Sequence, residues 1–169
     1  MSVLETERLR LRRLTPEDTA FVLRLLNEPS FIQNIGDKGV RTPDDARTYI
    51  ADGPAASYRK FGFGLWLVEL KESGAPVGIC GLLKRDALED PDLGYALLPE
   101  HWSRGYAFEA ASAVVARAGE EFGLRRLAAI TDPDNLSSIR VLERLGFEYL
   151  KTVRLSEDAP EVKLFARDT

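Results

Sequence analysis

The segment Trp102-Ser103-Arg104-Gly105-Tyr106-Ala107 decides how the rest of the chain is interpreted. It leads directly into Phe108-Glu109-Ala110-Ala111, and apolar residues then recur at helical spacing as far as Phe122. A helix that begins here leaves its first backbone N–H groups without intrahelical partners. Those groups and the positive end of the helix dipole favour phosphate oxygens, and Gly105 lets an anion approach the main chain. Because plain loops also place a glycine before a helix, the surrounding sequence is needed to decide.

Length and charge narrow the class of protein. The 169 residues suit one domain, predicted over residues 1–169. A net charge of −4 argues against binding to nucleic acid or to anionic membranes. The first residues are charged too early for a signal peptide, and no run reaches the roughly 18 apolar residues of a membrane span. We therefore expect a cytoplasmic protein. Cys80 and His101 are the single cysteine and the single histidine, which leaves no disulfide and no zinc site.

The first third of the chain predicts one strand and two helices. Alternation of leucine with arginine over residues 7–14 indicates a half-buried strand. Thr15-Pro16-Glu17-Asp18 and Thr42-Pro43-Asp44-Asp45 both have the composition of a helix start. We expect Pro29 to end the first helix and Asp52-Gly53-Pro54 to break the second. The polar segment between them, residues 30–41, is predicted to be irregular, with room for a short helical turn.

The remaining pattern predicts a sheet with helices on both faces, an α/β or α+β fold. Apolar runs at 63–70 and 77–84 indicate a hairpin, and 93–98 a further strand after an acidic loop. After the long helix, we expect a strand at 126–131, a short helix at 137–145 and closing strands at 147–155 and 161–166.

Several motifs in combination resemble the GNAT superfamily of acyl-CoA-dependent N-acyltransferases. They are Thr6-Glu7-Arg8-Leu9-Arg10-Leu11-Arg12, Leu93-Gly94-Tyr95, the segment 102–107, and the run from Asn135 to Leu145-Gly146-Phe147. More narrowly, the chain resembles the branch that includes the ribosomal-protein N-terminal alanine/serine acetyltransferases, where Trp is usual at position 102. The resemblance implies a central, mostly antiparallel mixed sheet, with acetyl-CoA as co-substrate.

The resemblance also implies which residues hold the co-substrate. The pyrophosphate of CoA would rest on the backbone amides of Ser103, Arg104, Gly105, Tyr106 and Ala107. The pantetheine arm would pair with the strand end at Leu97 and Leu98, and Asn135, Ser138 and Arg140 would add contacts. Two alternatives remain open, since Arg104 suits a solvated position equally well and Asn135 is common in turns.

Acyl transfer to an amine also benefits from a proton donor for the departing thiolate. Many members of the superfamily place a tyrosine in the helix after the asparagine, but the corresponding residue here is Leu142. Ser138 is the nearest replacement, and related ribosomal enzymes resemble that arrangement. Capping of the helix is the alternative role for Ser138, and a thiolate also leaves tolerably without an acid.

A general base is the other catalytic requirement. Asp92 matches a position where the branch often has Glu, and it would act directly or through a water. The alternative is a solvated acid in the loop that carries Glu89 and Asp90. His101, close to the cofactor segment, is the second candidate because histidine is the residue type with a reference pKa near neutrality. A surface or partly packed histidine is the alternative there.

The functional prediction is an N-acetyltransferase that transfers an acetyl group to a primary amine, as a monomer or homodimer. A protein N-terminal amine, with a reference pKa of about 8, needs less help from a base than an alkyl amine above 10. The weak base candidates therefore favour an N-terminal acceptor over a polyamine or another small amine. The competing class is a catalytically silent acyl-CoA-binding or protein-interaction module on the same fold.

Overall fold

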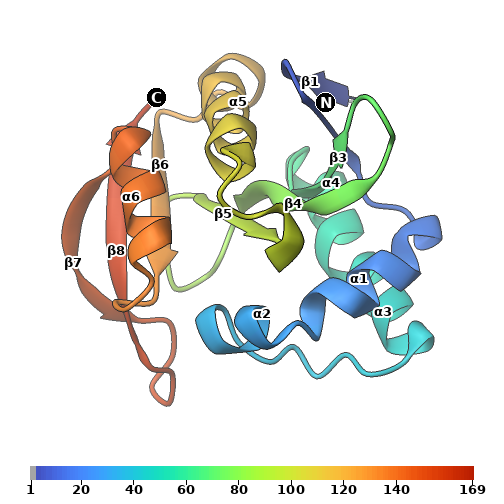
Figure 1. Cartoon of the computed structure of the whole chain (residues 1–169). Coiled ribbons are helices and arrows are strands. Elements are labelled where there is room, and N and C mark those ends of the chain that lie inside the picture. Colours follow the sequence, from blue (N-terminus) through green and yellow to red (C-terminus); the bar gives the residue numbers. More distant parts are fainter. Residues whose placement is uncertain (1–2) are drawn as a thin grey trace.

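The computed structural model describes residues 3–169, whose strands form one sheet in the order β1-β2-β3-β4-β5-β6-β8-β7 (Figure 1). The pairings are antiparallel except for the parallel pair β5–β6, which confirms a mixed, mostly antiparallel sheet. The strands are β1 (Val3–Glu5), β2 (Leu9–Arg13), β3 (Leu65–Leu70), β4 (Pro76–Leu83), β5 (Asp92–Leu97), β6 (Arg126–Thr131), β7 (Glu148–Arg154) and β8 (Glu161–Asp168).

Helices cover both faces of this sheet, as the sequence predicts. On one face, α5 and α6 pack with Leu9, Leu11 and Trp66 in one apolar cluster. On the other face, α1 and α3 pack with Leu67 and Ile79 in a second cluster (Figure 1). The helices are α1 (Thr19–Leu26), α2 (Pro29–Asn34), α3 (Pro43–Ile50), α4 (Ala56–Phe61), α5 (Tyr106–Phe122) and α6 (Leu136–Arg144). None of these helices is long and apolar enough to span a membrane, among the residues described.

The predicted helix starts are confirmed, but one predicted break is wrong. Thr15 caps a 3-10 turn, Pro16–Asp18, that leads into α1, and Thr42 caps α3. Each forms a capping box with an aspartate at the third position. At Pro54 the chain does not leave the helical path, because a π-helical turn over Ala51–Ala55 joins α3 to α4. Proline offers no N–H for a regular helical ladder, and a wider turn accommodates such an irregularity. The helical path ends instead at Gly62, whose φ of 82° is left-handed.

The single parallel pair of strands is short. Strands β5 and β6 pair only at Asp92 with Ala128 and at Leu93 with Ala129. Beyond these pairs, β5 continues for four residues and β6 for two. Helix α5 follows β5, and α6 follows β6. The two strands therefore part at their carboxyl ends, close to the first residues of two helices. Ligands in open α/β sheets commonly bind in this position. We call it the β5–β6 divergence.

Candidate active site

Beyond the paired residues, the edge of β5 that faces β6 is a row of backbone groups. The N–H of Leu98 donates to the carbonyl of Val77 in β4 at 2.9 Å, so alternation turns the N–H and C=O of Leu97 and Tyr95 the other way, toward the divergence. Leu98, which was also expected to pair with the pantetheine arm, turns its N–H toward β4 instead. Its N–H is used by β4, and its carbonyl accepts from the N–H of His101 at 2.9 Å. Tyr95 offers the free backbone groups instead.

Among residues 3–169, the carbonyl of Leu97 has one hydrogen-bond partner. The indole N–H of Trp102 donates to it at 3.0 Å, while the ring itself stays 47% exposed. A carbonyl oxygen has two lone pairs, so it can accept a second hydrogen bond. Trp102 thus fixes the start of the segment 102–107 against the free edge of β5.

The segment before α5 has the backbone geometry of an anion site. Ser103 has a φ of 61°, which is rare for a residue other than glycine, and Gly105 has a φ of 82°. No hydrogen bond among the described residues uses the backbone N–H groups of residues 103–108, whereas the N–H of Glu109 donates to the carbonyl of Gly105. Left-handed residues in such a turn gather consecutive N–H groups into an anion-binding concavity. The chain therefore supplies unpaired donors at the positive end of a 17-residue helix.

At the start of α6, the hydroxyl of Ser138 meets the phenol of Tyr95 from β5. Asn135 caps this helix, since its side-chain oxygen accepts from the N–H of Ser138 at 3.3 Å. Capping by Ser138, the alternative that the sequence left open, is therefore wrong. Its hydroxyl oxygen instead lies 2.9 Å from the phenol oxygen of Tyr95, which also donates to the Ser138 carbonyl at 3.1 Å. Burial raises the pKa of Tyr95 to about 12, although the hydrogen bond with Ser138 opposes the shift. Tyr95 therefore keeps its proton at neutral pH.

Position 142 carries no site chemistry. The side chain of Leu142 is 1% exposed and belongs to the apolar cluster under α5 and α6. Tyr95, whose phenol lies beside Ser138, was not among the residues expected at the site. The available signal was the alternation in Leu93-Gly94-Tyr95, which places Leu93 and Tyr95 on the same face of the sheet as α6.

Asp92 is a buried carboxylate. Asp92 is 1% exposed, so its interpretation as a solvated loop acid is wrong. One oxygen accepts from Arg85 Nε at 3.0 Å, and the other, Oδ2, has no partner in the described chain. Burial raises the pKa of Asp92 to about 6, even though the charges of Arg85 and Lys84 and the Arg85 hydrogen bond lower it. An unpartnered carboxylate oxygen with a pKa near neutrality suits a general base.

The two groups of candidate residues lie on opposite faces of the sheet. Tyr95 packs with the α5–α6 cluster, whereas Ala96, two pleats along from Asp92 on the same side, packs with the α1–α3 cluster. Asp92 and Tyr95 are separated along β5 by about 10 Å at the rise of a strand. Asp92 and the Tyr95–Ser138 pair therefore lie on different faces of the sheet.

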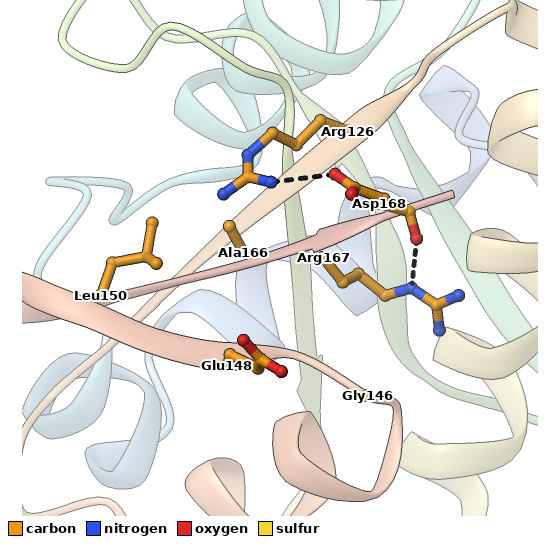
Figure 2. Close-up of a pocket in the computed structure, with 7 residues that line it drawn as sticks. All are labelled: Arg126, Gly146, Glu148, Leu150, Ala166, Arg167 and Asp168. Carbon is orange, nitrogen blue, oxygen red and sulfur yellow. Dashed lines mark hydrogen bonds and ion pairs between the residues drawn. The ribbon is translucent and has the colours of Figure 1, made fainter.

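The other predicted residues lie on the elements that flank the divergence, Arg104 just before α5 and Arg140 in α6. Arg104 and Arg140 are exposed. His101 ends a 3-10 turn, with its ring centroid 6.4 Å from that of Tyr106. The pocket in Figure 2 belongs to a different region, because β6, β7 and β8 line it and the ion pair of Arg126 with Asp168, at 2.8 Å, crosses it. That pocket contains none of the predicted site residues.

Comparison with known proteins assigns the class. The model of the acetyltransferase (GNAT) domain family matches residues 8–148. YkkB of Bacillus subtilis (strain 168), an uncharacterised protein, is 32% identical over 154 residues, which cover 89% of this chain and 88% of YkkB. The chain therefore belongs to the GNAT family and is an acetyltransferase.

Solved structures agree with this assignment. The acetyltransferase from Agrobacterium tumefaciens str. C58 superposes with a TM-score of 0.84 at 28% identity, covering 99% of this chain and 94% of the other. RimL, the ribosomal L7/L12 α-N-protein acetyltransferase in complex with coenzyme A, has a TM-score of 0.86 over 99% of this chain and 98% of its own. Its identity is 16%, so that likeness concerns the fold alone.

Proposed function

We propose that this protein transfers the acetyl group of acetyl-CoA to a primary amine by direct attack on the thioester, with a protein N-terminal amine as the favoured acceptor. The observation that carries the proposal is the β5–β6 divergence. It brings the unpaired N–H groups of residues 103–108, the free edge of β5 and the Ser138–Tyr95 hydroxyl pair to one place.

The residues present fit acetyl-CoA. The N–H groups of residues 103–107 would hold the pyrophosphate, and the backbone of Tyr95 and Leu97 would pair with the amides of the pantetheine arm. Arg104 and Arg140, both exposed, would add positive charge at the surface. When bound, acetyl-CoA supplies the activated carbonyl and a thiolate leaving group.

Ser138 is the proposed proton donor. Its hydroxyl would give a proton to the departing sulfur and receive one from the phenol of Tyr95, at 2.9 Å. Tyr95 is suited to this task because its raised pKa keeps the phenol protonated. Before the transfer both hydroxyls are neutral, so the resting pair places no charge on the apolar face beneath α5 and α6. The transfer to sulfur leaves the pair one proton short, and Tyr95 would regain that proton from solvent before the next turnover.

Asp92 is the proposed base. Because it faces the α1–α3 side of the sheet, it would take the proton of the incoming amine through a water. With a pKa of about 6, it is ionised at neutral pH but weakly basic. Such a base serves an N-terminal amine, with a reference pKa of about 8, better than a side-chain amine above 10.

An acceptor screen tests the proposal. Release of free CoA would be measured with peptides of different first residues, beside polyamines and small amines. N-terminal peptides should be the best acceptors, and blocking the α-amine should abolish release. If a polyamine is turned over faster than every peptide, the favoured acceptor is a polyamine and not an N-terminal amine.

The competing hypothesis is a silent acyl-CoA-binding module, and Leu142 in place of tyrosine is the feature that favours it. Both hypotheses predict that acetyl-CoA at 100 times its dissociation constant stabilises the fold by about 2.7 kcal/mol. Stabilisation without CoA release for any amine would support the silent module, and no stabilisation at millimolar acetyl-CoA would contradict both.

A further inference from the structure

The segment just before β2 is joined to the first turn of α5. The carboxylate of Glu109 accepts from the Arg8 backbone N–H at 2.9 Å, from Arg8 Nε at 2.7 Å and from the Thr6 hydroxyl. Burial opposes the charge on Glu109, but these hydrogen bonds and the Arg8 charge outweigh it and hold its pKa below the usual value. Glu109 is therefore an ionised anchor at the start of the helix.

Arg8 extends this link to the anion-binding segment. Its Nη1 donates to the carbonyl of Arg104 at 2.9 Å, and its guanidinium carbon lies 4.5 Å from the centroid of the Tyr106 ring. A Cβ on Gly105 would come within 3.3 Å of Arg8 Nη2. One guanidinium thus contacts three consecutive residues of the segment while its Nε is held by Glu109.

We propose that Arg8, fixed by Glu109, is a positioning residue that holds residues 104–106 in the conformation that binds the pyrophosphate of CoA. This inference rests on the proposed function. The Arg104 carbonyl, the regular helical acceptor for the Phe108 N–H, accepts from the guanidinium instead. Among the described residues, the N–H groups of residues 103–108 have no hydrogen-bond partner. Preorganised donors bind an anion without the cost of ordering the loop.

The planar fork of arginine is what this role requires, because separate nitrogens of Arg8 reach Glu109 and the Arg104 carbonyl. Lysine has a single nitrogen and cannot reproduce the geometry while keeping the charge. Arg8→Lys therefore separates positioning from simple electrostatic attraction. Arg10→Gln is the matched control, since Arg10 lies two residues on and pairs with Glu5 and Glu69 instead.

The experiment compares steady-state kinetics with acetyl-CoA and with S-acetylpantetheine, which lacks the pyrophosphate. Arg8→Gln, Arg8→Lys and Glu109→Gln should each raise KM for acetyl-CoA by about tenfold, the scale of a lost hydrogen bond to a charged group. Their kcat, and kcat/KM with S-acetylpantetheine, should match the wild type. Arg10→Gln should leave all values unchanged.

Three outcomes would overturn the inference: an unchanged KM in Arg8→Gln, full recovery by Arg8→Lys, or an equal loss with S-acetylpantetheine. Glu109→Gln tests the same link from the helix side if an Arg8 variant folds poorly. Wild-type protein that neither binds nor turns over acetyl-CoA would instead contradict the proposed function, so the two failures are distinguishable.

Discussion

The phenol oxygen of Tyr95 in β5 lies 2.9 Å from the hydroxyl oxygen of Ser138 in α6. This contact joins the strand and the helix on the two sides of the β5–β6 divergence. Position 142 in α6 is a buried leucine, so that residue does not supply the phenol beside Ser138. The phenol comes from the strand rather than from the helix.

Ser138→Ala should lower kcat by about 10²-fold, the lower end of the range for general acid catalysis, with little change in acetyl-CoA affinity. Tyr95→Phe keeps the ring and should also lower kcat, because Ser138 loses its source of a proton. Asn135→Ala is the control for the helix cap, expected to cost about 1 kcal/mol of stability. Stopped-flow and steady-state turnover, with melting temperatures, distinguish the roles. Normal turnover in Ser138→Ala would exclude it as the acid.

Asp92→Asn should remove the acidic limb of the pH–rate profile. In the wild type, kcat/KM should rise as pH passes about 6, where Asp92 ionises. The variant should be much slower near neutrality and recover as pH approaches the pKa of the acceptor amine, which then deprotonates unaided. His101→Gln is the comparison, since His101 is the second candidate base. A wild-type pH–rate profile in Asp92→Asn would exclude Asp92 as the general base and leave His101 as the next candidate.

The same substitution should change how stability depends on pH. Folding raises the pKa of Asp92 from 3.8 to about 6, so the native state binds the proton more tightly than the unfolded chain. The stabilisation is complete below pH 3.8 and is lost as pH rises to 6, by roughly 3 kcal/mol at 1.36 kcal/mol per pKa unit. Urea unfolding would be measured for both proteins at pH 4 and pH 7.5. The free energy of unfolding of Asp92→Asn, relative to that of the wild type, should be higher at pH 7.5 than at pH 4. A constant difference would contradict the raised pKa.

Gly105→Glu should abolish acetyl-CoA binding in a protein that still folds. The side chain adds a carboxylate and a Cβ at a φ of 82°, beside the N–H groups proposed for the pyrophosphate. Gly123→Glu is a matched control at the other end of α5, since Gly123 has a φ of 65° and open space around it. Both should lose about 1–2 kcal/mol from backbone strain. Calorimetric titration should show binding only in the control, and normal binding in Gly105→Glu would place the pyrophosphate elsewhere.

Local chemistry made much of this fold predictable. Thr15 and Thr42 start helices because a hydroxyl, a proline and an aspartate occupy successive capping positions. Gly105 and Gly123 delimit α5 through their left-handed backbone. Pro54 misled the prediction because a local rule for regular helices does not anticipate a π-helical turn. Strand β1 was not predicted, since three residues are too few to show alternation.

The site was less predictable because it depends on contacts between distant segments. Sequence places Asp92 in a run of acids, but its burial follows from pairing with Leu83 and Ala128 on neighbouring strands. Alternation gives the face of Tyr95, but only the packing of α6 on the sheet brings Ser138 to it. The orientation of the Leu98 N–H likewise depends on its hydrogen bond to Val77, which requires the register of β4 against β5.

The link from Arg8 to Glu109 spans 101 positions in sequence. A fragment that begins at β2 would contain every residue of the segment 102–107 and all of α5, yet would lack the groups that hold them. During folding, an interaction at this separation forms only after a large loop has closed. The anion site proposed at the start of α5 would therefore be a property of the assembled chain, acquired when its first residues dock beside the helix.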